Sequence, residues 1–243
     1  MKIEIKLLID YINKVSMNGT VLMLDLRFTE EGLRTAIKNQ SQTAMAIGFL
    51  PKDSFIEYEA IGDLYIKNSV MFMTLLKSFS DEVNISKVGE SMIKIHNSNR
   101  KAFMVLADEK ICDSLLQDKK PEIEYETCFK IDKKVLMQTL ADMKTLDVPH
   151  IKFVKKDNNV SIEIGKSKVY DFISNDNVGK EIEDLGETKD VEVGVGGGFE
   201  DVVRCLGSYP VFKIASDKPL TFIDNDDFME VEFMVAPFIE QEE

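Results

Sequence analysis

Apolar residues occur at every second position along most of this chain, a pattern that predicts β-strands with one buried face. The alternation is clearest near the C-terminal end, at 220–222 and 229–235, and the acidic stretch 224–227 predicts the turn of a hairpin. Pro237 cannot donate a hydrogen bond to a neighbouring strand, so we expect it to end the second strand. The same pattern predicts strands at 21–26, 33–38, 43–50, 83–88, 91–95, 102–106, 151–155, 160–164, 168–174 and 191–195.

Apolar residues at helical spacing interrupt this alternation four times. Asn18 and Gly19 form a stop signal after the first such segment, and Asp132 can cap the third, because its side chain accepts hydrogen bonds from free backbone N–H groups. The predicted helices span 6–17, 69–79, 132–146 and 199–206.

The order of strand, helix, several strands, helix and several strands occurs twice, with the two helices almost equally spaced in each half. A long period with only two copies predicts a duplicated domain rather than a solenoid. The charged stretch between the copies ends in a proline and predicts a linker, although it holds the apolar residues Ile111, Leu115 and Leu116. We therefore expect an α+β fold with an N-terminal domain at 1–106, a connecting loop at 107–121 and a C-terminal domain at 122–243.

Composition narrows the functions that such a chain can have. Of its 243 residues 44% are hydrophobic, without an apolar run of membrane-spanning length, so we expect a soluble protein with a sizeable core. The net charge of −13 disfavours a broad phosphate-binding surface, and work on DNA would require the basic residues to be gathered in one place. The acidic stretch 175–189 is expected to be a solvated loop. We expect no targeting leader, and the separated cysteines Cys112, Cys128 and Cys205 favour a reducing compartment.

One basic residue lies near the C-terminal end of each predicted helix: Lys14, Lys77, Lys144 and Arg204. The helix dipole and the unpaired carbonyl groups favour a cation there by roughly 0.3–1 kcal/mol, which explains the pattern without any function. Alternatively, the two helices of each half pack side by side and gather these cations on one face. A modest potential of that kind would attract DNA without holding it.

The sequence gives little support for an enzyme or a metal site. His96 and His150 lie in or beside predicted strands without a nearby cysteine or acid cluster, and no cysteine pair has metal-ligand spacing. The glycine-rich stretch 194–199 lacks the third glycine of a dinucleotide fingerprint, and the stretch from 224 lacks the glycine and glutamate of a calcium loop. We expect no catalytic residue, no metal and no cofactor.

The motif MVAPFIE at 234–240 resembles the close of the sliding DNA clamps of the proliferating cell nuclear antigen (PCNA) family. The chain is similar to that family at three further places, EGL at 31–33, PEIEY at 121–125 and FEDVVRCLG at 199–207, and the order of elements agrees over essentially its whole length. The resemblance implies a DNA-clamp fold in which two similar domains, each with two helices on antiparallel sheets, form part of a homotrimeric ring. Helices would line the hole through which duplex DNA passes, independently of its sequence.

The resemblance also implies roles for particular residues. The DNA-binding residues would be the four helix-end cations, Lys14, Lys77, Lys144 and Arg204. The edges that join subunits would include Phe103, Val105, Val169 and Phe172. A pocket for partner peptides, carried by DNA polymerase, a clamp loader and other proteins, would be lined by Ile37, Ile111, Leu115, Leu116, Ala236, Pro237, Phe238 and Ile239. The chain departs from the family at Lys38, where an apolar pocket residue is usual, and at Gln138 and Ala141, where basic residues are frequent.

The resemblance thus implies a processivity factor and docking platform for replication and repair enzymes, without catalytic activity. It would work inside the cell with DNA, in nucleoid, cytoplasm or nucleus, and not at a membrane. Three alternatives stand beside it at this point. They are a subunit of a heteromeric clamp, a viral-type monomeric or dimeric processivity factor, which the net charge disfavours, and a protein-interaction scaffold.

Overall fold

A computed structural model describes residues 1–112, 121–156, 159–165, 172–176, 178–184 and 190–238. The chain divides into two compact units. The first comprises Met1–Gln40, Ala46–Lys120 and Asn225–Val231, and the second comprises Ser41–Met45, Pro121–Asp224 and Glu232–Glu243. None of the helices within the described ranges is long and apolar enough to cross a membrane.

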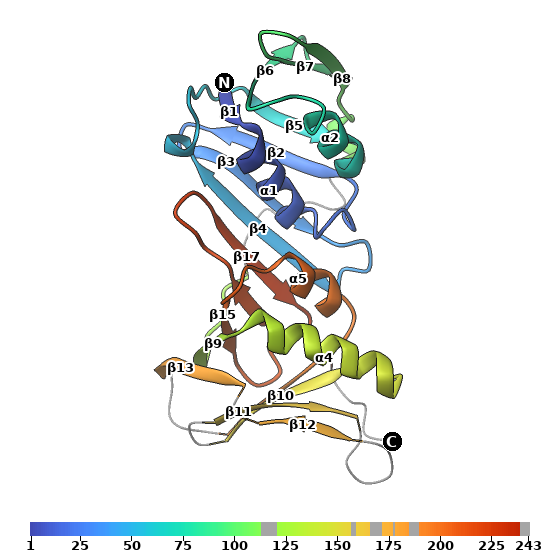
Figure 1. Ribbon diagram of the computed structural model, residues 1–243, viewed down its shortest axis with the longest axis vertical. Helices are drawn as coiled ribbons and strands as arrows, with labels where there is room; N and C mark the ends of the chain where they lie inside the picture. The colour runs from blue at the N-terminus through green and yellow to red at the C-terminus, as the bar shows by residue number, and fades with distance from the viewer. Residues whose placement is uncertain (113–120, 157–158, 166–171, 177, 185–189, 239–243) are drawn as a thin grey trace. The chain divides into compact units, whose positions relative to one another are not determined.

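In the first unit, the helices α1 (Ile5–Val15) and α2 (Ser69–Leu76) lie side by side on the same side of the sheet (Figure 1). Helix α1 buries Leu8, Ile12 and Val15, whose spacing places them on one face. Helix α2 begins at Asn68, whose side chain accepts a hydrogen bond of 2.9 Å from the backbone N–H of Met71. Both predicted helices are confirmed, the first ending two residues and the second three residues earlier than expected.

The first unit has antiparallel strands in two groups. One sheet has the order β1-β6-β7-β8, formed by Lys2–Glu4, Glu82–Val88, Met92–His96 and Lys101–Val105. The other group has the order β5-β2-β3-β4, formed by Gly62–Ile66, Leu24–Thr29, Gly32–Lys38 and Ala44–Pro51, and a 3-10 turn, η1 (Lys52–Ser54), follows β4. Gly32 is required in the β2–β3 turn, because its φ is +150° and a Cβ atom there would lie 2.3 Å from the carbonyl oxygen of Leu50. A short helix, α3 (Glu109–Cys112), lies in the stretch predicted as a linker.

The second unit repeats this arrangement. Helices α4 (Lys133–Leu146) and α5 (Phe199–Cys205) contact each other, and Asp132 caps α4 as predicted, accepting from the Lys134 N–H at 2.8 Å. One sheet has the order β12-β11-β10-β14, formed by Ile173–Asn175, Asn159–Ile164, Ile151–Lys156 and Val191–Val195. The other strands follow the order β13-β9-β15-β16-β17, formed by Gly179–Asp184, Thr127–Ile131, Val211–Ile214, Leu220–Ile223 and Glu230–Val235.

Aromatic packing fills the core of the second unit. The rings of Phe153, Phe199, Phe212 and Phe222 lie with neighbouring centroids 5.0–6.2 Å apart, in tilted, stacked and edge-on pairs. All four side chains are fully buried. Because these phenylalanines come from β10, α5, β15 and β16, their contacts join helix and strands in one core.

Two strand predictions and one loop prediction differ from the structure. The strand expected at 21–26 begins at Leu24, because Val21 and Leu22 instead accept hydrogen bonds from Ser69 at the start of α2. The expectation of a solvated loop at 175–189 is wrong for Gly179–Asp184, which forms β13 and pairs antiparallel with β9. That strand has a single apolar residue in its sequence, so alternation could not reveal it. Of the strand expected at 168–174, only Ile173 and Ser174 lie in β12, and 166–171 lie outside the described residues.

Candidate DNA-facing helices and docking segment

Positive charge gathers on the four long helices of this acidic chain. Helices α1, α2, α4 and α5, with the residue that caps α2, carry seven basic and four acidic side chains, a net charge of +3 in a chain of −13. The bases are Lys6, Lys14, Lys77, Lys133, Lys134, Lys144 and Arg204, and the acids are Asp10, Asp142, Glu200 and Asp201. The helices are thus one part of this acidic chain that could meet phosphate groups.

In the second unit, Glu200 holds two of the predicted DNA-binding residues together. Its Oε1 atom accepts hydrogen bonds from Lys144 Nζ at 3.0 Å and from Arg204 Nε at 3.1 Å. Hydrogen bonds donated by Arg204 and Lys144 lower the pKa of the Glu200 carboxyl, which therefore stays charged at neutral pH. The three side chains remain substantially exposed, so the cations face solvent while one anion partly neutralises them.

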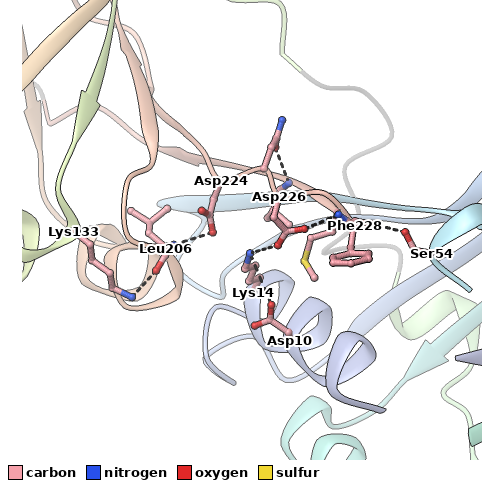
Figure 2. A network of polar contacts seen from close by, with 12 residues as sticks. Asp10, Lys14, Ser54, Lys133, Leu206, Asp224, Asp226 and Phe228 are labelled. Carbon is pink, nitrogen blue, oxygen red and sulfur yellow. Dashed lines mark hydrogen bonds and ion pairs between the residues drawn. The ribbon is translucent and has the colours of Figure 1, made fainter. Parts of the chain in front are cut away.

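The other two predicted DNA-binding residues differ in exposure. Lys77 is exposed and ends α2, its backbone N–H donating to the Met73 carbonyl. Lys14 is buried, with a side chain only 10% exposed, and its Nζ atom lies 3.5 Å from Asp226 Oδ2 and 4.0 Å from Asp10 Oδ2 (Figure 2). The expectation that Lys14 meets DNA does not fit this burial, because its charge is already satisfied inside the first unit.

Residues 225–231 complete the first unit. Besides the ion pair between Asp226 and Lys14, the Ser54 hydroxyl donates a 2.7 Å hydrogen bond to the Phe228 carbonyl (Figure 2). Asp226 also caps its own turn, accepting from the N–H groups of Phe228 and Met229 at 2.9 Å. The acidic turn between β16 and β17 therefore has a structural role, and its carboxylate fixes Lys14.

Lys133 closes the C-terminal end of α5, a role that the sequence did not reveal. Its Nζ atom donates to the Leu206 carbonyl at 2.5 Å (Figure 2). It also donates to the Arg204 carbonyl at 3.2 Å. The Gly207 N–H donates to Asp224 Oδ2 at 3.0 Å. The two bonds from Lys133 satisfy carbonyl groups at the end of the helix that carries Arg204, and the Asp224 bond holds the residue that follows it. A lysine at the start of its own helix gives no sequence signal for capping a different one.

The C-terminal segment runs along β14, an outer strand of its sheet. Pro237 forms an antiparallel bridge with Val195, and the Phe238 N–H donates to the Gly194 carbonyl at 2.7 Å. A Cβ atom on Gly194 would lie 2.8 Å from the Phe238 carbonyl oxygen, so this close approach requires glycine. The Phe238 ring stacks on His150, with centroids 4.3 Å apart and an interplanar angle of 12°.

The structure places the other predicted pocket residues as follows. Phe238 is 42% exposed, and Ala236 and Pro237 are half-buried, so this segment presents an aromatic surface. Ile111 on α3 is 61% exposed. Ile37 is 1% exposed and lies in the core of the first unit, so its expected role as pocket lining does not fit. Leu115, Leu116 and Ile239 lie outside the described residues.

The predicted subunit edges lie on outer strands of their sheets. Strand β8 pairs with β7 alone among the described strands, and Phe103 and Val105 on it are exposed. Strand β12 likewise pairs only with β11 in the described part of the chain, and Phe172, just before it, is exposed. Val169 lies outside the described residues. Each edge has unpaired backbone groups that could continue a sheet into another chain.

Burial and the nearby Lys94 lower the pKa of His96, and His150 packs against Phe238. Within the described ranges, no group of three or more His, Cys, Asp or Glu side chains is arranged to hold a metal ion.

Comparison with known proteins defines the fold. No protein-family model and no curated protein sequence matches the chain. Among solved structures, PCNA from A. fulgidus, bound to the C-terminal region of FEN-1, matches with a TM-score of 0.78 and 18% identity over 99% of this chain and 98% of that chain. PCNA from Entamoeba histolytica matches with a TM-score of 0.79 and 14% identity over 98% of each chain. PCNA from Thermococcus kodakaraensis matches with a TM-score of 0.73 and 16% identity over 98% of this chain and 99% of that chain.

These matches confirm the predicted fold class. The chain has an α+β DNA-clamp fold, with the repeated helix pairs and antiparallel sheets described above. The clamps that it resembles in structure are those of PCNA.

Proposed function

We propose that this protein is a sliding DNA clamp of the PCNA family. It would encircle duplex DNA and act as a processivity factor and docking platform for DNA polymerase, a clamp loader and other replication and repair enzymes, without catalysing a reaction itself. The observation that carries the proposal is the agreement of fold with PCNA over at least 98% of both chains. Such a protein would work inside the cell, where the DNA is.

The distribution of charge supports this function. A closed ring leaves DNA only by opening or by reaching an end, so its contacts with phosphate can be weak and independent of sequence. A net charge of +3 on the long helices of a chain with −13 suits weak attraction better than tight binding. Lys77, Lys144 and Arg204 are the DNA contacts that we retain, since they are exposed, whereas Lys14 is buried.

We assign 1–106 and 122–243 to the two clamp domains and 107–121 to the loop that connects them. Three copies would close the ring by pairing the edge at β8 with the edge near β12, where Phe103, Val105 and Phe172 are exposed. Partner peptides would bind at the C-terminal segment, where Phe238 offers an exposed ring on a fixed backbone. The binding of the C-terminal region of FEN-1 by A. fulgidus PCNA supports the docking of partner segments in general.

Topological retention on DNA tests the proposal. The chain is mixed at high concentration with linear duplex DNA that has biotin at both ends, so that rings can thread on, and streptavidin is then added to block the ends. After transfer to high salt, a clamp should stay on the blocked DNA and leave DNA with open ends, because salt weakens phosphate contacts but cannot open a link. Equal loss from both DNAs would contradict encirclement.

Light scattering during size-exclusion chromatography provides the second measurement. A mass near three times 27.6 kDa is expected for the homotrimer. A trimer without retention on blocked DNA would refute the clamp function. A chain that stays monomeric or dimeric at every concentration would contradict the homotrimer and favour a mixed ring or an open processivity factor.

A further inference from the structure

We propose that a hollow beside the start of α4 binds single-stranded DNA, with an unpaired base stacked on Tyr209 and the backbone phosphates held by Lys130 and Lys134. The hollow has a volume of about 520 Å³, which is in the range of small-ligand sites. It lies between the first turns of α4 and the residues Ser208 and Tyr209. This binding would be separate from the encirclement of duplex DNA and would not require a closed ring.

The backbone on both sides of Tyr209 is held in place, and the Tyr209 ring is left uncovered. The Lys133 N–H donates to the Ser208 carbonyl at 2.9 Å, and the Ile131 N–H donates to the Pro210 carbonyl at 3.2 Å. These two bonds fix the backbone on both sides of Tyr209, whose side chain is nevertheless 60% exposed. An exposed aromatic ring on a fixed backbone can stack on a base without a large loss of its own conformational entropy.

One lysine lies near this ring, and two more line the hollow. Lys130 Nζ lies 5.9 Å from the centroid of the Tyr209 ring, and Lys134 is exposed on the first turn of α4. Lys133 adds a third positive charge, although its Nζ atom is occupied by the carbonyl groups at the end of α5. The acid that lines the hollow, Asp132, caps α4. Three cations around one anion, in a chain of net charge −13, favour an anionic ligand.

The combination of ring and cations favours single-stranded DNA over other anions. The bases of a duplex are stacked on one another and cannot cover Tyr209, whereas every unpaired base has a face that can stack. An acidic peptide would use the lysines but has no planar group for the ring. Met137 and Gln138 also line the hollow and are exposed, which adds an apolar contact and a neutral hydrogen-bonding group beside the base.

The experiment compares two fluorescent strands of equal length and charge, oligo-dT and an abasic deoxyribose-phosphate strand, by anisotropy at low salt. The wild-type chain should bind oligo-dT more tightly, by roughly 5- to 150-fold for one stacked base. Tyr209→Phe should keep this preference, since the ring remains, and Tyr209→Ala should abolish it. Lys134→Ala should lower the affinity for both strands and reduce the slope of log affinity against log salt by about 0.7.

Phe228→Ala is the matched control, because Phe228 is also an exposed aromatic residue but belongs to the first unit. It should leave both affinities unchanged, and circular dichroism should show that all variants are folded. Equal binding of the two strands by the wild-type chain would overturn the proposal. The proposal would also be overturned if poly-glutamate competed with oligo-dT and if Tyr209→Ala weakened the binding of poly-glutamate as much as that of oligo-dT. Neither result would affect the retention of rings on blocked duplex DNA, so the two proposals fail separately.

Discussion

Replacing Glu200 with glutamine should strengthen the attraction of the helices for DNA. In the wild-type chain the Glu200 carboxylate binds both Lys144 and Arg204, at 3.0 and 3.1 Å. The substitution would remove one negative charge and release two cations toward solvent without changing the size of the side chain. Because the ion pairs are exposed, the loss of stability should be about 0.5–2 kcal/mol in total, too little to unfold the unit.

The magnitude of the effect on DNA follows from counterion release. Each additional phosphate contact on a duplex steepens the plot of log affinity against log salt by about 0.9, so two released cations predict a change of up to about 1.8. The assay is fluorescence anisotropy of a short labelled duplex over a salt series, at a protein concentration where the oligomeric state is constant. Glu200→Gln should bind more tightly at low salt and lose affinity faster as salt rises.

Glu192→Gln is the control for this prediction. Glu192 on β14 is an exposed glutamate in an ion pair, with Oε2 3.4 Å from Lys152 Nζ, and it lies on a sheet rather than a helix. Its replacement removes the same charge from the chain, so any effect of net charge alone would appear in both variants. Equal salt slopes for the two variants would refute the assignment of Lys144 and Arg204 to the DNA-facing surface.

Three further predictions concern docking, assembly and pH. Gly194→Ala should displace Phe238 and break the 2.7 Å hydrogen bond between the two residues. The affinity for a partner peptide, measured by calorimetry, should then fall by about 2- to 12-fold. An unchanged affinity would exclude the C-terminal segment from the pocket. Phe103→Asp should reduce the light-scattering mass to one copy, with thermal unfolding of the chain unchanged, since the ring is 55% exposed; a retained trimer would exclude this edge. Burial raises the pKa of Asp25, against the effect of Arg27, so the folded unit favours the protonated acid. The free energy of unfolding should therefore fall as pH rises above about 4, and Asp25→Asn should reduce this dependence on pH in a denaturation series. The same pH dependence in the wild-type chain and in Asp25→Asn would contradict the raised pKa of Asp25.

The candidate site was only partly accessible to sequence reasoning. The helix-end rule located Lys77, Lys144 and Arg204, because the dipole and the free carbonyl groups act within one turn. The same rule selected Lys14, whose burial depends on Asp226, far away in the sequence. Pairing with Glu200 was equally hidden, since Lys144 belongs to a different helix.

The sequence by itself determined where most helices and strands lie, because their periodicity and caps involve residues a few positions apart. The face of α1 formed by Leu8, Ile12 and Val15 and the cap at Asp132 are of this kind.

Only the tertiary structure decided which distant segments meet. Strand β13 is held by backbone hydrogen bonds to β9, which do not depend on an apolar pattern, and so its sequence looks like a polar loop. Phe238 reaches β14 because Gly194 leaves room for its carbonyl oxygen. The backbone on both sides of Tyr209 is fixed by bonds that Lys133 and Ile131, far away in the chain, donate to Ser208 and Pro210. A local pattern cannot specify such contacts, because their energy depends on a partner that only the folded chain brings near.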